Sequence, residues 1–399
     1  MRTYQLLILS LLFPLIASAQ FRIDVGEGKV LTLSQAIQAW DVVSFRMHNS
    51  FYSVDSRNDF YIRRGRIAVE GDVRSSLTFS VAVAYDGIAK DRYTPTAGSP
   101  NDNNDSFYFW NVEWVWSAAP EFNVVFGYFR PQVGREQMSS EFNVISFDKS
   151  LADGQPRLHL VGRSSGREGG VNIGGLFLRD GWSLNYNVGM FDPSAAAIIA
   201  NGLKWSPLLT GRLALSIGDP ELTKYKISYS QVGNGARHGV TIGLNAARQG
   251  ATDVFKSNAL YGGDLLVNAG PLDLAAEVDW MRRAYHPSYL ETIPPIEVPV
   301  EPTTDYVYSL KLGWRFPLGE EQAVEPMLMA TGERAEEAVG WHSFNPSTGS
   351  RSRDLYDVGV NWLIDRDRVK LNLHYVWGRE YWNSNPYYSY IGVGTQLLY

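Results

Sequence analysis

The sequence predicts an all-β fold, a transmembrane antiparallel β-barrel of about 16 strands with long external loops. Three observations predict it: long segments alternate between apolar and polar residues, short turns alternate with long polar connections, and the chain begins with an export signal. Residues 182–190 (WSLNYNVGM) show the alternation. Every second residue from Trp182 to Met190 is apolar, and the residues between them are serine, asparagine or glycine. A period of two indicates a β-strand whose two faces meet different surroundings.

Residues 1–20 have the features of a secretory signal peptide, because Arg2 precedes an apolar run that ends in the small residues of SAQ. Removing this segment leaves 35 of the 36 basic residues against 42 acidic ones, so the net charge changes from −6 to −7. A net negative charge argues against a nucleic-acid partner. The 399 residues include no cysteine, which excludes disulfides, thiolate metal sites and cysteine nucleophiles.

Residues 21–37 are expected to form a short periplasmic segment ahead of a barrel at 38–399. Thr32 and Gln35 match the T-x-x-Q capping box that opens many helices, and Ala36, Ile37 and Trp40 follow it. This pattern predicts a short helix before the first wall strand.

Seventeen segments have the period and length of strands. They are 38–48, 59–71, 75–86, 106–117, 121–130, 167–178, 182–190, 206–217, 223–232, 237–248, 257–268, 272–284, 306–316, 322–332, 353–364, 369–377 and 387–399. Bacterial barrels normally have an even number of strands, with both chain ends in the periplasm. The weakest segment is 223–232, because both of its faces are mixed. Leaving it out predicts sixteen strands, and eighteen with one strand overlooked remains the alternative.

The apolar face of these strands is expected to meet lipid. A soluble core lined with serine, asparagine, glycine and lysine would contain many unpaired polar groups, whereas a water-filled lumen satisfies them. The last segment, 387–399, alternates regularly and ends on Tyr399. It resembles the terminal strand by which outer-membrane barrels are recognised for insertion. The predicted location is therefore the outer membrane of a Gram-negative bacterium, with membrane lipid and lipopolysaccharide as partners.

Four long polar segments are expected to be external loops: 87–105, 131–166, 286–303 and 334–352. Acidic side chains in 101–106 and 291–305 could bind cations that bridge to lipopolysaccharide, but solvated loop tips are the favoured explanation. The pattern G-x-S-x-G at 162–166 lies in a loop before a strand, where no nucleophile elbow is expected. The six histidines are scattered singly, so no catalytic set, metal site or cofactor is predicted.

Several motifs resemble the phosphate-selective porin O and P family. They are FYIRRGRIAVEGDV (60–73), NVEWVW (111–116), VVFGYFRPQVGREQMSSEF (124–142) and GREGGVNIGGLF (166–177). The most specific is G-x-F-R-P-x-x-G-x-E, which runs from Gly127 to Glu136, although the family more often has lysine before the proline. Pro131 cannot donate to a strand ladder, so the fifth strand should end there. The resemblance implies a homotrimeric 16-stranded channel in which loop 131–166 folds into the lumen and narrows it.

Charged residues on the inner face are candidates for ion selectivity. Ile67 and Val69 mark the lipid face of the second strand, so Arg64, Arg66 and Glu70 should project into the lumen. The full set of predicted pore-lining residues is Arg64, Arg66, Glu70, Glu113, Arg130, Arg135, Arg157, Lys311, Arg315 and Lys370. Two alternatives remain open for these arginines. They form an exposed basic track, or they pair with acidic residues of the wall and loop.

The sequence therefore predicts a non-enzymatic porin that passes small hydrophilic solutes, with a mild preference for small anions rather than strict phosphate specificity. Two other functions remain possible for a barrel of this size. One is an outer-membrane barrel enzyme, which needs serine, histidine and an acid near the membrane rim. The other is a structural barrel whose pore is plugged.

Overall fold

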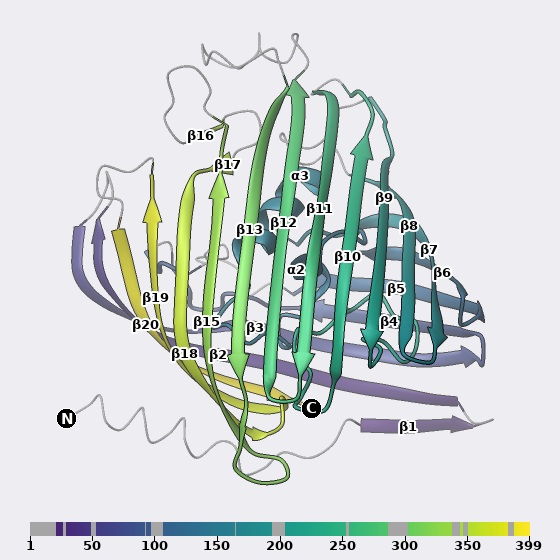
Figure 1. Ribbon diagram of the computed structural model, residues 1–399, viewed down its shortest axis with the longest axis horizontal. Coiled ribbons are helices and arrows are strands. Elements are labelled where there is room, and N and C mark those ends of the chain that lie inside the picture. Colours follow the sequence, from purple (N-terminus) through teal and green to yellow (C-terminus); the bar gives the residue numbers. More distant parts are fainter. Residues whose placement is uncertain are drawn as a thin grey trace.

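The computed structural model describes residues 21–26, 29–48, 53–91, 93–96, 107–163, 165–193, 204–252, 255–285, 302–336, 344–345, 350–381 and 387–399. Sixteen of the described strands form a closed antiparallel barrel (Figure 1). They are β2 (Lys29–His48), β3 (Ser53–Arg74), β4 (Leu77–Ala84), β5 (Tyr108–Ala119), β6 (Phe122–Phe129), β7 (Glu168–Arg179), β8 (Trp182–Asp192), β9 (Leu208–Gly218), β10 (His238–Gln249), β11 (Phe255–Ala269), β12 (Leu272–Tyr285), β13 (Thr303–Trp314), β15 (Ala323–Arg334), β18 (Arg353–Asp365), β19 (Val369–Glu380) and β20 (Tyr387–Leu398).

Four shorter strands and two helices complete the described elements. The strands are β1 (Phe21–Gly26), which pairs with the start of β2, β14 (Phe316–Pro317), and the hairpin of β16 (Phe344–Asn345) and β17 (Ser350–Arg351). The helices are α2 (Arg135–Met138) and α3 (Leu151–Val161). Among the described residues, no helix is long and apolar enough to span a bilayer.

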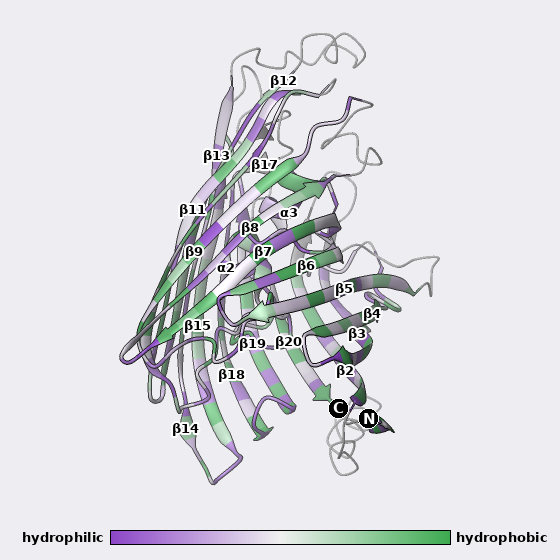
Figure 2. Ribbon diagram, turned by 90° about the vertical axis from the view of Figure 1, so that its right-hand side faces the viewer, coloured by the Kyte–Doolittle hydropathy of each residue, from purple (hydrophilic) through white to green (hydrophobic). Residues whose placement is uncertain are grey.

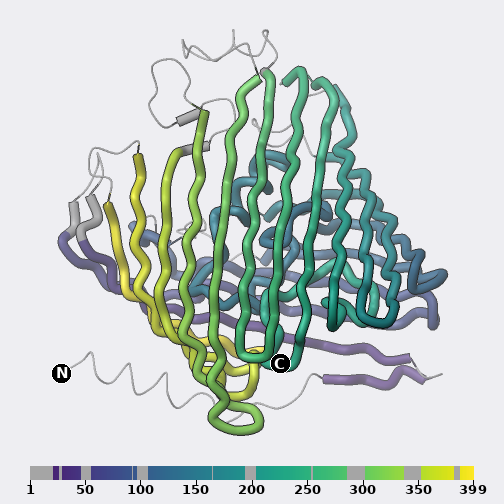
Figure 3. Tube along the Cα trace, in the orientation of Figure 1, coloured from purple at the N-terminus to yellow at the C-terminus, as the bar shows by residue number. Residues whose placement is uncertain are grey.

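The ring closes between the first and last wall strands. β2 pairs with β20 from Ala36 opposite Leu398 to Phe45 opposite Ser389. Gln35 and Tyr399 exchange two backbone hydrogen bonds, at 2.9 and 2.7 Å. In Figure 3 the yellow C-terminal strands lie beside the purple N-terminal strands at one side of the barrel. The terminal segment recognised in the sequence is thus the strand that removes the last free edge of the sheet.

The two faces of the wall differ as the alternation predicts. On β8 the side chain of Val188 is 61% exposed on the outer surface, whereas Asn187 beside it is 1% exposed and faces inward. Green and purple bands alternate along the strands in Figure 2 for the same reason. Aromatic side chains form outward-facing belts near both ends of many strands, including Trp116, Trp182, Trp314 and Trp362 at one end and Tyr261, Trp280, Tyr306 and Trp377 at the other.

A closed barrel with an apolar outer surface and aromatic belts is the architecture of an outer-membrane protein. In the closed ring the strands pair with their neighbours through backbone hydrogen bonds, as a hydrocarbon environment requires. The protein is therefore located in a Gram-negative outer membrane. The prediction of sixteen strands is confirmed, since residues 223–232 are not part of the wall.

The predicted helix before the first wall strand is wrong. Residues 29–37 belong to β2, and Thr32 lies opposite Glu70 of β3. A capping box is only a local signal, and a helix forms only if the residues after it continue the helical pattern. Here Leu31, Leu33 and Gln35 instead continue the period of two of the barrel strand. The barrel therefore begins before residue 38. The predicted signal peptide, loop segment 101–106 and most of 291–305 lie outside the described residues.

Residues 131–166, here called the constriction loop, fold into the barrel. β6 ends at Phe129, two residues before Pro131, as the proline predicts. Helices α2 and α3 of this loop lie behind the wall strands in Figure 1, inside the ring. Neither helix was predicted, because α2 is a single turn and α3 contains Pro156. Helix propensity alone disfavours proline in a helix interior, so the packing around α3 has to stabilise it.

An arginine on the outer surface should destabilise the barrel. We expect Val188→Arg to lower the free energy of unfolding by about 2–4 kcal/mol, because Val188 lies near the middle of β8 and faces the hydrocarbon. Unfolding in lipid vesicles by guanidinium titration measures this change. Val188→Leu is the matched control and should leave the midpoint within experimental error. Equal midpoints for the two variants would contradict the assignment of the faces.

Candidate pore constriction

The constriction loop is bonded to the inner wall over a wide arc. Glu136 of α2 pairs with Lys311 of β13 at 2.6 Å. Further along the loop, the amide of Phe147 donates to the Asp357 carboxylate of β18 at 2.8 Å. The Phe147 ring stacks on Trp40 of β2, with the ring centroids 4.1 Å apart. These contacts hold the loop along the part of the ring that runs from β13 through β18 to β2.

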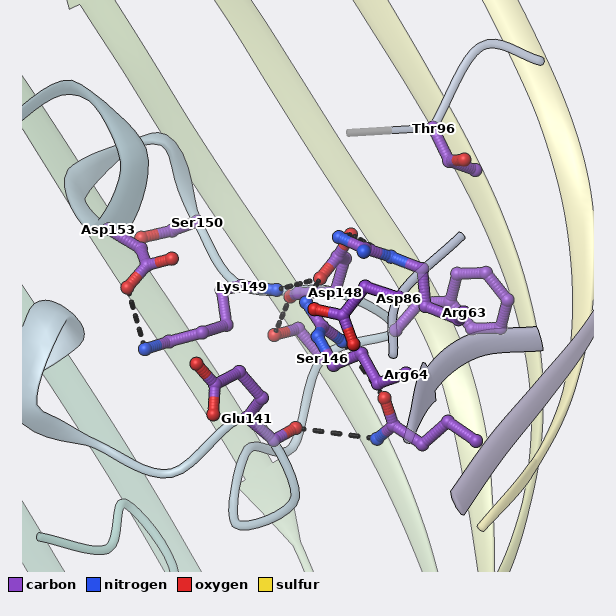
Figure 4. A network of polar contacts seen from close by, with 12 residues as sticks. Arg63, Arg64, Asp86, Thr96, Glu141, Ser146, Asp148, Lys149, Ser150 and Asp153 are labelled. Carbon is purple, nitrogen blue, oxygen red and sulfur yellow. Dashed lines mark hydrogen bonds and ion pairs between the residues drawn. The ribbon is translucent and has the colours of Figure 1, made fainter. Parts of the chain in front are cut away.

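Where the loop meets β3, basic and acidic side chains gather in a group here called the arginine cluster (Figure 4). Asp148 of the loop accepts hydrogen bonds from both Arg63, at 2.8 Å, and Arg64. The cations of the cluster are Arg63, Arg64, Arg66, Arg130, Lys149, Arg157 and Arg167, and its carboxylates are Asp86, Glu141, Asp148 and Asp153. Among these described residues the cations outnumber the carboxylates, so the cluster carries an excess of positive charge.

Most of the cluster is organised as buried ion pairs. Arg66 pairs with Asp86, and Arg130 pairs with Glu141. The Arg130 side chain also donates to the Gln137 carbonyl at 2.5 Å, so it ties the start of the loop to α2. Of the two alternatives that the sequence left open, pairing with wall and loop acids describes these arginines. A buried charge of this kind is tolerated only because partners replace its hydration.

Arg167, which directly precedes β7, has a different environment. Its guanidinium carbon lies 3.4 Å from the ring centroid of Trp110, and that of Arg66 lies 3.7 Å from it. The hydrogen bonds of Arg167 go to neutral acceptors, the Asn111 side chain at 2.6 Å and the Ser165 carbonyl at 2.7 Å. The face of an aromatic ring stabilises a cation without neutralising it. The charge of Arg167 therefore contributes to the positive excess.

Burial and neighbouring charges shift pKa values within the constriction loop. Burial, together with repulsion by Arg130, lowers the pKa of Arg157 to about 10. Burial also lowers the pKa of Lys149 to about 8, against the attraction of Asp153 and with a further contribution from Arg130 and Arg157. In contrast, the pKa of Asp148 lies well below its usual range, because Arg63 and Arg64 outweigh the effect of its burial. Each of these lowered pKa values means that the group binds a proton less readily.

Four predicted pore-lining residues are buried contacts within the barrel: Arg135, Lys311, Arg315 and Lys370. Arg135 Nε pairs with Asp264 of β11 at 2.8 Å. Lys370 Nζ donates to the Val144 carbonyl of the loop at 3.0 Å. These cations attach inserted segments to the wall, so they do not belong to the arginine cluster.

Glu70 and Glu113 lie on the more exposed part of the inner wall. Glu70 of β3 is exposed and Glu113 of β5 is half-buried. In the sheet both lie opposite Ser80 of β4, one on each side of it. Inward-facing residues elsewhere are buried, among them Asn187 of β8 at 1% and Lys311 of β13 at 0%. Among the described residues, solvent therefore reaches the inner wall mainly along β3–β5, next to the arginine cluster.

The structure brings four predicted site residues together in the cluster: Arg64, Arg66, Arg130 and Arg157. Sequence reasoning missed Arg63, Trp110 and Arg167. A β-bulge between β2 and β3 places Arg63 and Arg64 both inward, which breaks the period of two that was used to assign faces. A second bulge between β4 and β5 adjoins Trp110. The adjacent arginines in YIRRGR were the only local signal for the first bulge.

Several solved structures with a similar fold are porins or outer-membrane channels. An anion-selective porin from Comamonas acidovorans has a TM-score of 0.59 at 11% identity, with 93% of this chain and 100% of that chain covered. Salmonella typhi OmpF, in complex with daunomycin, has a TM-score of 0.56 at 12% identity, with 94% and 100% covered. The channel DcaP of Acinetobacter baumannii has a TM-score of 0.55 at 10% identity, with 96% and 100% covered.

No protein-family model and no curated protein sequence matches the chain. The fold is that of a 16-stranded outer-membrane porin. At identities of 10–12% the likeness concerns the fold, and function has to be argued from the interior of this barrel.

Titration of Lys149 should change the charge of the arginine cluster. With a pKa of about 8, the protonated fraction of Lys149 falls from about nine-tenths at pH 7 to about one-tenth at pH 9. We expect any anion preference measured by the zero-current potential in a salt gradient to weaken over this interval. Because the pKa is lowered in the folded state, the same titration should raise stability as the pH increases from about 8 toward 10.5.

Two variants separate Lys149 from other titrating groups. Lys149→Arg keeps its charge at both pH values and should not show the change, whereas Lys149→Met should behave at pH 7 as the wild type does at pH 9. The same pH response in Lys149→Arg and in the wild type would show that another group titrates.

Proposed function

We propose that the protein is an outer-membrane porin through which small hydrophilic solutes diffuse passively, with a mild preference for anions. The observation that supports it best is the excess of positive charge in the arginine cluster, beside the part of the inner wall that solvent reaches. A cation within about 8 Å of a passing ion acts on it before salt screens the interaction. More distant charges of the protein contribute little to selectivity.

The preference should be mild rather than strict for two reasons. Four of the seven cations are offset by carboxylates, and the acidic residues Glu70 and Glu113 follow toward the periplasmic end of the same wall. Tight binding of phosphate would require several cations to turn toward one ligand, and Arg64 and Arg130 already donate to Asp148 and Glu141. An ion that binds weakly can also leave quickly, as conduction requires.

The resemblance to the phosphate-selective porin O and P family supports the same proposal. In the motif G-x-F-R-P-x-x-G-x-E, Arg130 and Glu136 are the charged residues that attach the loop, to Glu141 and to Lys311 respectively. The motif therefore specifies how the constriction loop is anchored. Family membership and a trimeric assembly are part of the proposal, and chemical cross-linking of native outer-membrane fractions tests the trimer.

A barrel enzyme is the less supported alternative. His374 is bonded to Asp357 and Asn361, and His159 to the Ala259 carbonyl. In neither described contact does a serine hydroxyl face the imidazole, which serine hydrolysis requires. Both histidines are buried in the contacts between the wall and the inserted segments.

Planar-bilayer recording tests the function. We expect an ohmic channel whose zero-current potential in a KCl gradient indicates mild anion preference. Arg167→Gln removes a cation that no described carboxylate pairs with, and should move the potential toward cation preference. Arg368→Gln is the matched control, because this exposed arginine of the turn between β18 and β19 pairs with Asp365 far from the cluster. A silent wild type would contradict the porin, and a wild type selective for potassium would contradict the anion preference alone.

A further inference from the structure

The connection between β9 and β10, residues 219–237, runs inside the barrel. The other described connections at this end are short, for example the turns at 75–76, 180–181 and 270–271. We propose that residues 219–237, here called the lumenal insert, are a positioning element that fixes the constriction loop and fills the β7–β10 side of the lumen. The loop and the insert together would then set the cross-section of the pore. This inference rests on the proposed porin function and adds a second determinant of solute size.

The insert is attached to the inner wall by two tyrosines. Tyr225 donates to the Asn187 side chain at 2.8 Å and accepts a hydrogen bond from Asn172 at 2.9 Å. Tyr229 donates to Asn185. All of these side chains are buried. The polar face of β7 and β8, which the sequence suggested would line a wet lumen, is therefore covered by the insert, whose hydroxyl groups bond to it.

The wall leaves room for this contact. A Cβ atom on Gly174 of β7 would lie 2.3 Å from the Tyr225 hydroxyl and 2.6 Å from Asn187 Oδ1. Any side chain at this position would therefore push the tyrosine away. The absence of a side chain at Gly174 lets the insert lie directly against the strand.

The insert also pairs with the constriction loop through the backbone. Ser139 and Tyr229 form a parallel β-bridge. The Tyr229 amide donates to the Met138 carbonyl at 3.3 Å, and the Ser140 amide donates to the Tyr229 carbonyl at 3.2 Å. Two residues further on, the Gln231 amide donates to the Asn143 carbonyl at 3.3 Å. These hydrogen bonds fix which residues of the loop and the insert lie side by side, so they set the height at which the loop crosses the lumen.

Side chains strengthen this contact where the loop meets the wall. Gln231 Nε2 donates to Glu136 at 2.6 Å, and Gln231 Oε1 accepts from Lys311 at 3.2 Å. Glu136 and Lys311 also pair directly, so the three side chains close a triangle among insert, loop and β13. Lys311 and Lys149 lower the pKa of Glu136 to about 2 against the effect of its burial. Glu136 therefore stays ionised over the physiological pH range.

Both ends of the insert are bonded, the start to the constriction loop and the end to the barrel. Near its start, Glu221 pairs with Arg135 of the constriction loop. Near its end, the Gly233 amide donates to Asp273 of β12 at 3.0 Å, and Asn234 accepts from Arg315 at 2.9 Å. A segment held at both ends and along its middle occupies its side of the lumen permanently. Permeating solutes are left with the part of the lumen along β3–β5.

Removal of the insert tests its effect on pore size. Asp219 and His238 already pair through their backbones, so a two-residue Asn-Gly turn can replace residues 220–237. We expect the single-channel conductance of this variant to rise by at least about twofold, and larger sugars to enter liposomes in swelling assays, because pore diameter controls both. An unchanged conductance in a folded variant would overturn the proposal.

A pair of point variants tests the positioning without a deletion. Gln231→Ala removes the contacts with Glu136 and Lys311, and should increase open-channel current fluctuations as the loop gains freedom. Lys224→Ala is the matched control, because Lys224 is exposed on the same insert. Equal fluctuations in the two variants would contradict a positioning role for Gln231.

A disulfide tests whether the insert stays docked, and the absence of cysteine from the chain gives a clean background. Ser140 and Ser230 directly follow the bridged pair, so Ser140→Cys with Ser230→Cys should form a cross-link in the folded protein. We expect the conductance to be the same before and after reduction. Failure to cross-link, or a conductance that changes on reduction, would overturn permanent docking. The cross-link is read on gels, so it remains informative even if the wild type forms no channel and the porin proposal fails.

Discussion

The ion pair between Glu136 and Lys311 joins the parts of this barrel that the sequence keeps far apart. Glu136 lies in the constriction loop, Lys311 on β13, and Gln231 of the lumenal insert bonds to both. Burial removes the water around both charges, so each is stabilised only when all of its protein partners are in place. Loop, insert and wall are therefore held in one arrangement, and the position of the remaining passage follows from it.

Polar groups are satisfied differently on the two sides of the wall. Toward lipid, the closed ring pairs the backbone with itself, and apolar side chains cover it. Toward the interior, the inserts bring hydroxyl, amide and carboxylate groups to the inner face, as Tyr225 does for Asn172 and Asn187. The polar face thus meets protein on the β7–β10 side and solvent along β3–β5. A barrel of sixteen strands is wide enough for both.

The arginine cluster shows how a chain with net negative charge can present a positive constriction. Ion pairs such as Arg64 with Asp148 hold the loop in place, and the unbalanced remainder, including Arg167 on Trp110, carries the electrostatic effect. Structural and functional charges are therefore mixed in one network. Replacing a paired arginine also strands its partner acid, so Arg167 reports on selectivity more cleanly than Arg64.

The sequence by itself determined the barrel, the orientation of the strand faces and the strand that closes the ring, because a period of two is a local property that the membrane enforces along every strand. Chain parity favoured sixteen strands over eighteen. The sequence also excluded 223–232 from the wall. Tertiary structure decided where that segment goes, which acid each arginine pairs with, and that residues 29–37 extend a strand instead of forming a helix. The bulge that turns Arg63 inward depends on strand pairing, and the contact of Gln231 with Glu136 joins residues 95 positions apart. Such contacts exist only once the ring has closed around the inserted segments.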